Sequence, residues 1–250
     1  MILIPLPHYG FDPTESAVPW DYLASRGVEI VFATPDGKAA AADERLITGR
    51  GFGVFKTFLM ANDTAIEAYQ RMSADTAFKH PISYSEIKVS DYDGLILPGG
   101  HDKGMKTYLE SSVLQAKIAK FFAEKKIIGA ICHGTVLAIR TINPQNQRSV
   151  LYDYQTTSLL KMQEMSAYYL TVLWLSDYYR TYPITVEDEV KSGLKSSKQF
   201  QSGAFSLRRD SLKNESPAFV TEDRNYLSAR WPGDAYTFSK RFYHLLKKVK

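Results

Sequence analysis

Short apolar runs recur along the chain and predict the buried strands of a sheet. The run 126–131 reads Lys-Ile-Ile-Gly-Ala-Ile and does not alternate between apolar and polar side chains. Such a run is typical of a central parallel strand, because helices cover both of its faces. Similar runs cover 1–6, 28–33 and 92–97.

Amphipathic segments between these runs predict helices. The clearest start is at Asp12, which can cap a helix whose first position is Pro13 and whose third is Glu15. Gly27 is a stop signal for this helix. Further helices are predicted over 54–77, with an interruption at 62–63, and over 111–124, 157–180 and 235–248.

The remaining segments predict an edge strand, a hairpin and surface loops. Residues 186–190 fit an edge strand, 219–229 fit two strands joined by a turn, and the serine-rich stretch 192–216 fits a surface excursion. We therefore predict one doubly wound α/β domain over residues 1–250. Its sheet is mostly parallel and flavodoxin-like, with helical insertions near 50–80 and 157–215.

Composition excludes several classes of protein. The 250 residues contain 44% hydrophobic and 23% charged residues, as in ordinary globular proteins. The net charge of +4 is mild, and its basic excess near the end of the chain is typical of a solvated helix end rather than of a nucleic-acid surface. A single cysteine excludes an internal disulfide framework and a four-cysteine zinc site.

Targeting and membrane segments are not expected either. The chain opens on a strand-like run without the basic and apolar regions of an export signal. The most apolar later segment, 159–175, contains Lys161, Gln163 and Glu164, so it does not form an uninterrupted membrane span. We expect a cytoplasmic protein that binds neither membrane nor nucleic acid.

Cys132, the only cysteine, stands where the strand 126–131 turns into a helix. Ala130 and Gly134 supply the small neighbours that a sharp strand-to-helix corner requires, which is the geometry of a nucleophile elbow. The start of the helix favours the thiolate, so we expect a thiol pKa well below the reference of about 8.5. The alternative is a small buried hydrophobic residue.

Other chemical groups also follow strands, and the carboxyl ends of parallel strands meet at one edge of a sheet. His8, His101 and His133 each come just after a predicted strand, as does Glu15. The pair Gly99-Gly100 lets backbone amides point into a site, as an oxyanion hole requires, although an ordinary tight turn has the same sequence. Glu15 alone could be only a helix-capping carboxylate.

These motifs resemble those of the ThiJ/PfpI superfamily, relatives of the class I glutamine amidotransferases. The resemblance rests on Leu-Pro-Gly-Gly-His at 97–101, Ala-Ile-Cys-His-Gly at 130–134, Asp-Pro-Thr-Glu at 12–15 and Ser-Ala-Arg-Trp-Pro-Gly at 228–233. It covers nearly the whole chain in order and is nearest to the ThiJ-like glyoxalase/chaperone branch.

The resemblance implies a role for each site residue. Cys132 is the nucleophile, Glu15 is the buried acid that hydrogen-bonds its sulfur, and His133 is the adjacent base. The amides of Gly100 and His133 form the oxyanion hole. His8, His101 and Arg230 are expected to line the pocket.

Two departures from the family pattern bear on the reaction. Glyoxalase-type members carry an acid that orients the histidine, and Asp153 is the nearest candidate in this sequence. Asp153 could equally be a turn residue, and we expect it to point away from His133. The helical insertion at 157–180 lies outside the common fold.

Three functions remain open from the sequence. The first is a cofactor-free, metal-free enzyme that converts small reactive carbonyls such as methylglyoxal to hydroxy acids, with Glu15 or His133 moving a proton. The second is a Cys-His amide or peptide hydrolase. The third is a cysteine redox sensor or stress holdase. The family and the aromatic-rich insertion also lead us to expect a homodimer.

Overall fold

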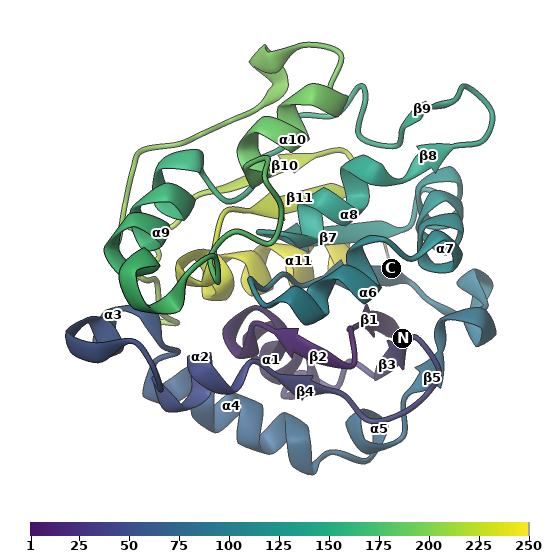
Figure 1. Cartoon of the computed structure of the whole chain (residues 1–250). Coiled ribbons are helices and arrows are strands. Elements are labelled where there is room, and N and C mark those ends of the chain that lie inside the picture. The colour runs from purple at the N-terminus through teal and green to yellow at the C-terminus, as the bar shows by residue number, and fades with distance from the viewer. Residues whose placement is uncertain (250) are drawn as a thin grey trace.

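The computed structural model describes residues 1–249, which form a three-layer α/β structure around a seven-stranded sheet (Figure 1). The strand order is β10-β11-β7-β6-β1-β3-β5, and every pairing is parallel except that between β10 and β11. The strands are β1 (Ile2–Pro5), β3 (Ile30–Thr34), β5 (Ile82–Ser83), β6 (Gly94–Leu97), β7 (Ile127–Ile131), β10 (Val220–Asp223) and β11 (Tyr226–Ala229). The doubly wound, mostly parallel sheet predicted from the apolar runs is confirmed.

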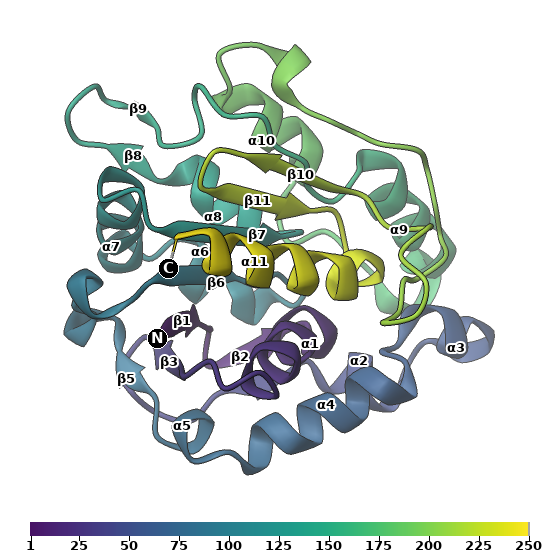
Figure 2. The same ribbon diagram turned by 180° about the vertical axis from the view of Figure 1, so that it is seen from behind.

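Helices cover both faces of the sheet because its central strands are apolar on both sides. One face packs against α1 (Pro13–Ala24) and α11 (Ala235–Val249), which lie in front of the sheet in Figure 2. The other face packs against α7 (Ser112–Ala123) and α8 (Gly134–Arg140). The remaining pieces around them are α2 (Glu44–Thr48), α3 (Lys56–Leu59), α4 (Asp63–Ala74), α5 (Thr76–Lys79), α6 (Lys106–Leu109), and the small pairs β2 (Tyr9–Phe11) with β4 (Ala41–Ala42) and β8 (Ile142–Asn143) with β9 (Arg148–Ser149).

The segment between α8 and β10 contributes no strand to the main sheet. It contains α9 (Lys161–Leu175), shorter than the helix predicted over 157–180. The predicted edge strand at 186–190 is wrong, because these residues begin α10 (Val186–Gly193). Thr185 caps that helix by accepting the amide of Asp188, and Val186 and Val190 share one buried helical face.

A buried ion pair ties the polar loop before β10 to the start of α11. Arg230 and Asp234 have no solvent exposure, and Arg230 donates to both carboxylate oxygens of Asp234 at 2.9 Å. Arg230 also donates to the carbonyls of Ala204 at 2.7 Å and Pro217 at 3.3 Å. Through the Ala204 carbonyl, Arg230 therefore fixes the surface segment 192–216 to the start of α11.

Replacing Asp234 with asparagine is expected to lower the free energy of unfolding by about 3–5 kcal/mol, since it leaves the buried Arg230 without a counter-charge. Urea denaturation measures the change. The matched control is Asp21→Asn, because Asp21 makes a similar two-bond pair with Arg71 on the surface and an exposed pair contributes about 0–1 kcal/mol. Equally small losses in both variants would contradict the prediction.

Candidate active site

Cys132 lies at a strained corner between β7 and α8. Its φ angle is +55°, a left-handed conformation that residues other than glycine adopt at a cost of about 1–3 kcal/mol. The amide of Cys132 donates to the Ala229 carbonyl of the adjacent strand β11 at 3.1 Å. The corner therefore holds the cysteine at the carboxyl edge of the sheet, although the side chain is only 1% exposed.

Glycines allow the backbone to pack closely around this corner. A Cβ atom at Gly134 would lie 1.9 Å from the Leu97 carbonyl oxygen. A Cβ atom at Gly99 would lie 2.6 Å from the His133 amide nitrogen, 2.7 Å from Glu15 Oε2 and 3.0 Å from Cys132 Cβ. Only glycine fits at either position, and the two loops after β6 and β7 are thereby brought into contact.

Glu15 points into this corner instead of capping its own helix. Asp12 caps α1 by accepting the amides of Thr14 at 2.7 Å and Glu15 at 3.2 Å, but its own amide donates to Gly99, so no capping box forms. The Gly99 amide donates to Glu15 Oε2 at 2.7 Å. Glu15 is fully buried beside Cys132, and its Oε1 has no hydrogen-bond partner among the described residues.

Two histidines complete the surroundings of the thiol. Nδ1 of His133 lies 3.4 Å from Cys132 Sγ, within hydrogen-bond range for sulfur. The ring of His101 meets the rings of His133 and Tyr179 edge to face, with centroid distances of 4.9 Å in both cases. Nδ1 of His101 is buried and has no partner within residues 1–249.

Burial dominates the protonation of this cluster. It raises the pKa of the Cys132 thiol well above its ordinary value, helped by the charges of Glu15 and Asp12, and it raises the pKa of Glu15 well above normal. Burial also lowers the pKa of His133 well below 6.5 and that of His101 to about 4. All four shifts favour the uncharged form of the group: the thiol, the carboxyl and the two imidazoles. The expected low thiol pKa is contradicted, because the desolvation cost exceeds the effect of the helix start.

Alkylation of Cys132 by iodoacetamide is therefore expected to be slow at pH 7 and to rise about tenfold per pH unit up to at least about pH 9, because the thiolate is the reacting species. Mass spectrometry follows the reaction at a single site, since the chain has one cysteine. The control is the urea-unfolded chain, whose rate is expected to level off above a pKa of about 8.5. An alkylation rate that levels off below pH 8 in the folded protein would contradict the raised pKa of Cys132.

Two backbone amides are available beside the thiol. Among the described residues, neither the Gly100 amide nor the His133 amide donates to a protein oxygen, although both residues are buried or nearly so. The two come from the loops that Gly99 brings into contact. An oxygen bound to a carbon on Cys132 could receive both amides, which is the arrangement of an oxyanion hole.

Three of the expected site residues lie elsewhere. As expected, Asp153 points away from His133: its side chain is 61% exposed and its carboxylate lies 3.5 Å from Lys195 Nζ. His8 pairs with Asp36 at 3.1 Å at the surface and does not line the cavity described below. Arg230 also misses the cavity, because the carboxylate four residues later binds its guanidinium within the protein.

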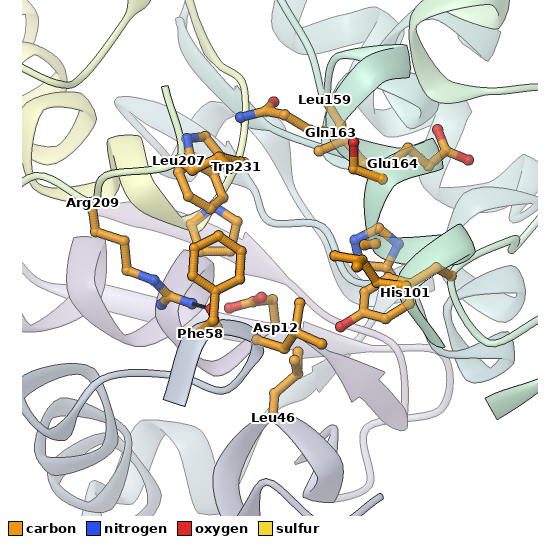
Figure 3. Close-up of a pocket in the computed structure, with 16 residues that line it drawn as sticks. Asp12, Leu46, Phe58, His101, Leu159, Gln163, Glu164, Leu207, Arg209 and Trp231 are labelled. Atoms are coloured by element: carbon orange, nitrogen blue, oxygen red, sulfur yellow. Dashed lines mark hydrogen bonds between the residues drawn. The ribbon is translucent and has the colours of Figure 1, made fainter. Parts of the chain in front are cut away.

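An apolar cavity of about 100 Å³ lies next to the cysteine site (Figure 3). His101 lines it, as the sequence led us to expect, and Asp12, Glu164, Arg209 and Trp231 add polar groups. Sequence reasoning missed these four as site residues. The sequence predicts only a helix cap at Asp12, Trp231 stands beside Arg230 in the same motif, and Arg209 lies in a loop without any periodic pattern. The apolar walls are Leu46, Phe58, Leu59, Leu159, Leu170 and Leu207.

The same corner contains a set of potential metal ligands. A ring nitrogen of His101, a ring nitrogen of His133 and Cys132 Sγ all lie within 4.8 Å of one another. One thiolate and two imidazoles suit Zn²⁺ or a softer ion. That the site works without metal or cofactor stays an expectation.

A doubly wound sheet with a cysteine at a strained strand-to-helix corner, a histidine after it and a buried glutamate beside it defines the class of α/β proteins with an elbow cysteine. The chain belongs to the family described as ThiJ/PfpI family-like, which matches residues 6–204.

Relatives of this chain bear names that refer to two reactions. The chain is 26% identical over 166 residues to a deglycase of Pyrococcus abyssi, covering 66% of this chain and 69% of that protein. It is 26% identical over 155 residues to a glutathione-independent glyoxalase of Schizosaccharomyces pombe, covering 60% of each. The crystal structure of glyoxalase III from Candida albicans has a TM-score of 0.70 at 17% identity, covering 98% of this chain and 96% of that one, which shows a common fold.

No helix within residues 1–249 has the length and apolar character needed to cross a membrane.

Proposed function

We propose that the protein is a cofactor-free, cysteine-dependent enzyme that converts small 2-oxoaldehydes to 2-hydroxy acids, with methylglyoxal giving lactate. The observation that carries the proposal is the buried Glu15 carboxyl beside the Cys132 thiol. A carboxyl that keeps its proton near a nucleophile suits proton transfer between adjacent carbons. The deglycase and glyoxalase names of relatives support the same class of substrate.

The chemistry follows from the contacts of the thiol. Cys132 Sγ attacks the aldehyde carbon, its proton passes to Nδ1 of His133, and the new C–O⁻ group receives the amides of Gly100 and His133 and then a proton. The result is a hemithioacetal. Moving the C1 proton to C2 through an enediol gives a thioester of the 2-hydroxy acid, and water then releases the acid and restores the thiol.

Glu15 is suited to the proton shift by its own hydrogen bonds. Oε2 accepts the Gly99 amide, which leaves Oε1 as the oxygen suited to carry the acidic proton, since it has no hydrogen-bond partner among the described residues. Oε1 can give its proton to the C2 oxygen, and the carboxylate so formed can take the C1 proton to give the enediol. The same carboxyl then delivers a proton to C2 while the C1 hydroxyl loses its proton to Glu15 or His133, which leaves the thioester. Burial raises the pKa of Glu15 and so favours the form that carries this proton.

Amide hydrolysis has less support than aldehyde chemistry. A Cys-His hydrolase needs a histidine that protonates the leaving amine, usually oriented by a third group. Asp153 is exposed and faces Lys195, so it does not supply this third group for His133. A redox sensor has less support too, because ready oxidation requires an accessible, low-pKa thiolate and Cys132 is 1% exposed.

The test is incubation of the purified protein with methylglyoxal without glutathione, followed by enzymatic measurement of lactate. Lactate in stoichiometric excess over protein supports the proposal. No lactate from the wild-type protein removes it.

A cytoplasmic homodimer stays a prediction for the assembly. Support comes from exposed apolar side chains on α9, where Leu173 is 92% exposed, Tyr169 68% and Trp174 49%. A second copy could cover this face.

A further inference from the structure

The cavity beside the cysteine site has two chemically different ends (Figure 3). His101 lies at one end, where its ring nitrogen is within 4.8 Å of Cys132 Sγ. Arg209 and Trp231 lie at the other end, and Asp12 lies between them. The cavity holds several water-sized groups. Half of its other lining residues are leucine or phenylalanine, and the rest include Gln163, Glu164, Ser166 and Tyr179. A ligand with an apolar middle and a polar group at each end fits this arrangement.

The far end presents two hydrogen-bond donors that nothing in the described chain satisfies. Arg209 Nη1 and Trp231 Nε1 are both buried and both lack a partner within residues 1–249. The guanidinium carbon of Arg209 lies 5.9 Å from the centre of the Trp231 ring, so the two donors come from neighbouring groups. A buried donor without an acceptor is unfavourable, and more so when it is charged.

Arg209 is held in place by its other nitrogen. Nη2 donates to the carbonyls of Met60 at 2.8 Å and Phe58 at 3.3 Å. These contacts fix the guanidinium plane and leave Nη1 free to meet a ligand. The rigid placement distinguishes Arg209 from its neighbour Arg208, which is exposed.

Asp12 balances the charge of Arg209 without occupying its free donor. Figure 3 shows Arg209 reaching toward Asp12, whose charge acts on the guanidinium, but Nη1 of Arg209 has no hydrogen-bond partner among the described residues. Oδ1 of Asp12 accepts the amides of Thr14 and Glu15 instead. The donors of Arg209 and Trp231 are thus open to an acceptor from outside the chain, which can be a ligand or a water.

We propose that Arg209 Nη1 and Trp231 Nε1 bind an acceptor oxygen, a carboxylate or a carbonyl, at the far end of an apolar substrate whose reactive carbonyl lies at the His101 end of the cavity. The substrate is then an aryl or branched-alkyl 2-oxoaldehyde that carries this second oxygen group, and methylglyoxal fills only the reactive end. The reactive half of this inference rests on the proposed function. The binding half rests on the two unpartnered donors alone.

The test is calorimetric binding of three unreactive probes of one shape: benzoate, benzamide and toluene. Either oxygen-bearing probe is expected to bind about tenfold more tightly than toluene. A preference for benzoate identifies a carboxylate, and equal preference for benzamide identifies a carbonyl. Equal binding of all three, or no binding, overturns the inference.

Two variants and one control assign the binding to these donors. Trp231→Phe keeps an aromatic wall and removes only the N–H, so the advantage over toluene is expected to fall about threefold to tenfold. Arg209→Met is expected to remove the tighter binding of the oxygen-bearing probes, and Arg208→Met is expected to leave it unchanged. An unchanged advantage in Trp231→Phe and Arg209→Met overturns the assignment. The binding assay needs no turnover, so the two proposals can fail separately. If the protein makes no lactate but binds the oxygen-bearing probes more tightly than toluene, the proposed reaction is wrong and the proposed binding site stands.

Discussion

Replacing Cys132 with serine is expected to lower lactate formation from methylglyoxal by about three orders of magnitude or more. Serine is close in size to cysteine and fits the same corner, so the fold is retained. Its hydroxyl is a far weaker nucleophile than a thiolate and has no strong base beside it, since His133 lacks an orienting acid. The measurement is kcat/KM from lactate release, with circular dichroism to verify folding.

The control for this variant is Asp153→Asn. Asp153 was the one candidate for a third catalytic group, and its exposed side chain faces Lys195. Its replacement is expected to leave the rate within about twofold of wild type, as for a surface change away from the site. Cys132→Ser activity above about a tenth of wild type would show that the reaction does not pass through sulfur.

Replacing Glu15 with glutamine is expected to lower kcat by about 10²–10⁴, the usual contribution of a positioned acid or base. The amide keeps the shape of the carboxyl and can still accept the Gly99 amide, but it cannot exchange a proton with the substrate. The loss is expected in kcat rather than KM, because the group acts in the proton shift.

The same variant is expected to be more stable than wild type at neutral and alkaline pH. Burial raises the pKa of Glu15 in the folded protein, so the folded state holds this proton more tightly than the unfolded chain does. The stability linked to that proton is present below the unfolded pKa of about 4.3 and is lost as pH rises toward the folded pKa. Glutamine does not titrate and avoids this loss.

Melting temperatures at pH 5 and pH 8 measure the effect. The melting temperature of Glu15→Gln is expected to exceed that of wild type by more at pH 8 than at pH 5. A smaller difference at pH 8 would contradict the raised pKa of Glu15. Wild-type activity in this variant would instead return Glu15 to a structural role. Lower activity combined with higher stability is typical of a residue retained for function.

Sequence patterns spanning a few residues correctly predicted the backbone elements that position the site. The apolar run before Cys132 and the small residues around it indicated the strand-to-helix corner, and φ at Cys132 has the value that such a corner requires. Asp12 and Pro13 indicated the start of α1. These features depend on neighbours within a few residues, so sequence patterns report them directly.

Short or isolated signals were misleading. Val-Glu-Asp-Glu-Val at 186–190 fits both a strand and one turn of a helix, and Thr185, a capping residue, was the signal that could have decided between them. Arg230 was assigned to the pocket from its motif, although Asp234 four residues later offered a partner inside the protein. His8 follows the predicted first strand, but its side chain pairs with Asp36 at the surface.

The sequence by itself determined the parallel sheet, the corner at Cys132 and the residues that gather at the carboxyl edge. The spacing of apolar residues and the small side chains around Cys132 act within a few residues of the chain, so the sequence shows them directly. Only the tertiary structure decided the direction in which the pKa values of the site are shifted and the shape of the cavity. Burial is the sum of contacts from distant segments, and it reversed the expected direction of the Cys132 pKa. Arg209 and Trp231, far apart from Asp12 in the chain, meet it only through folding, so no local pattern could have placed them together.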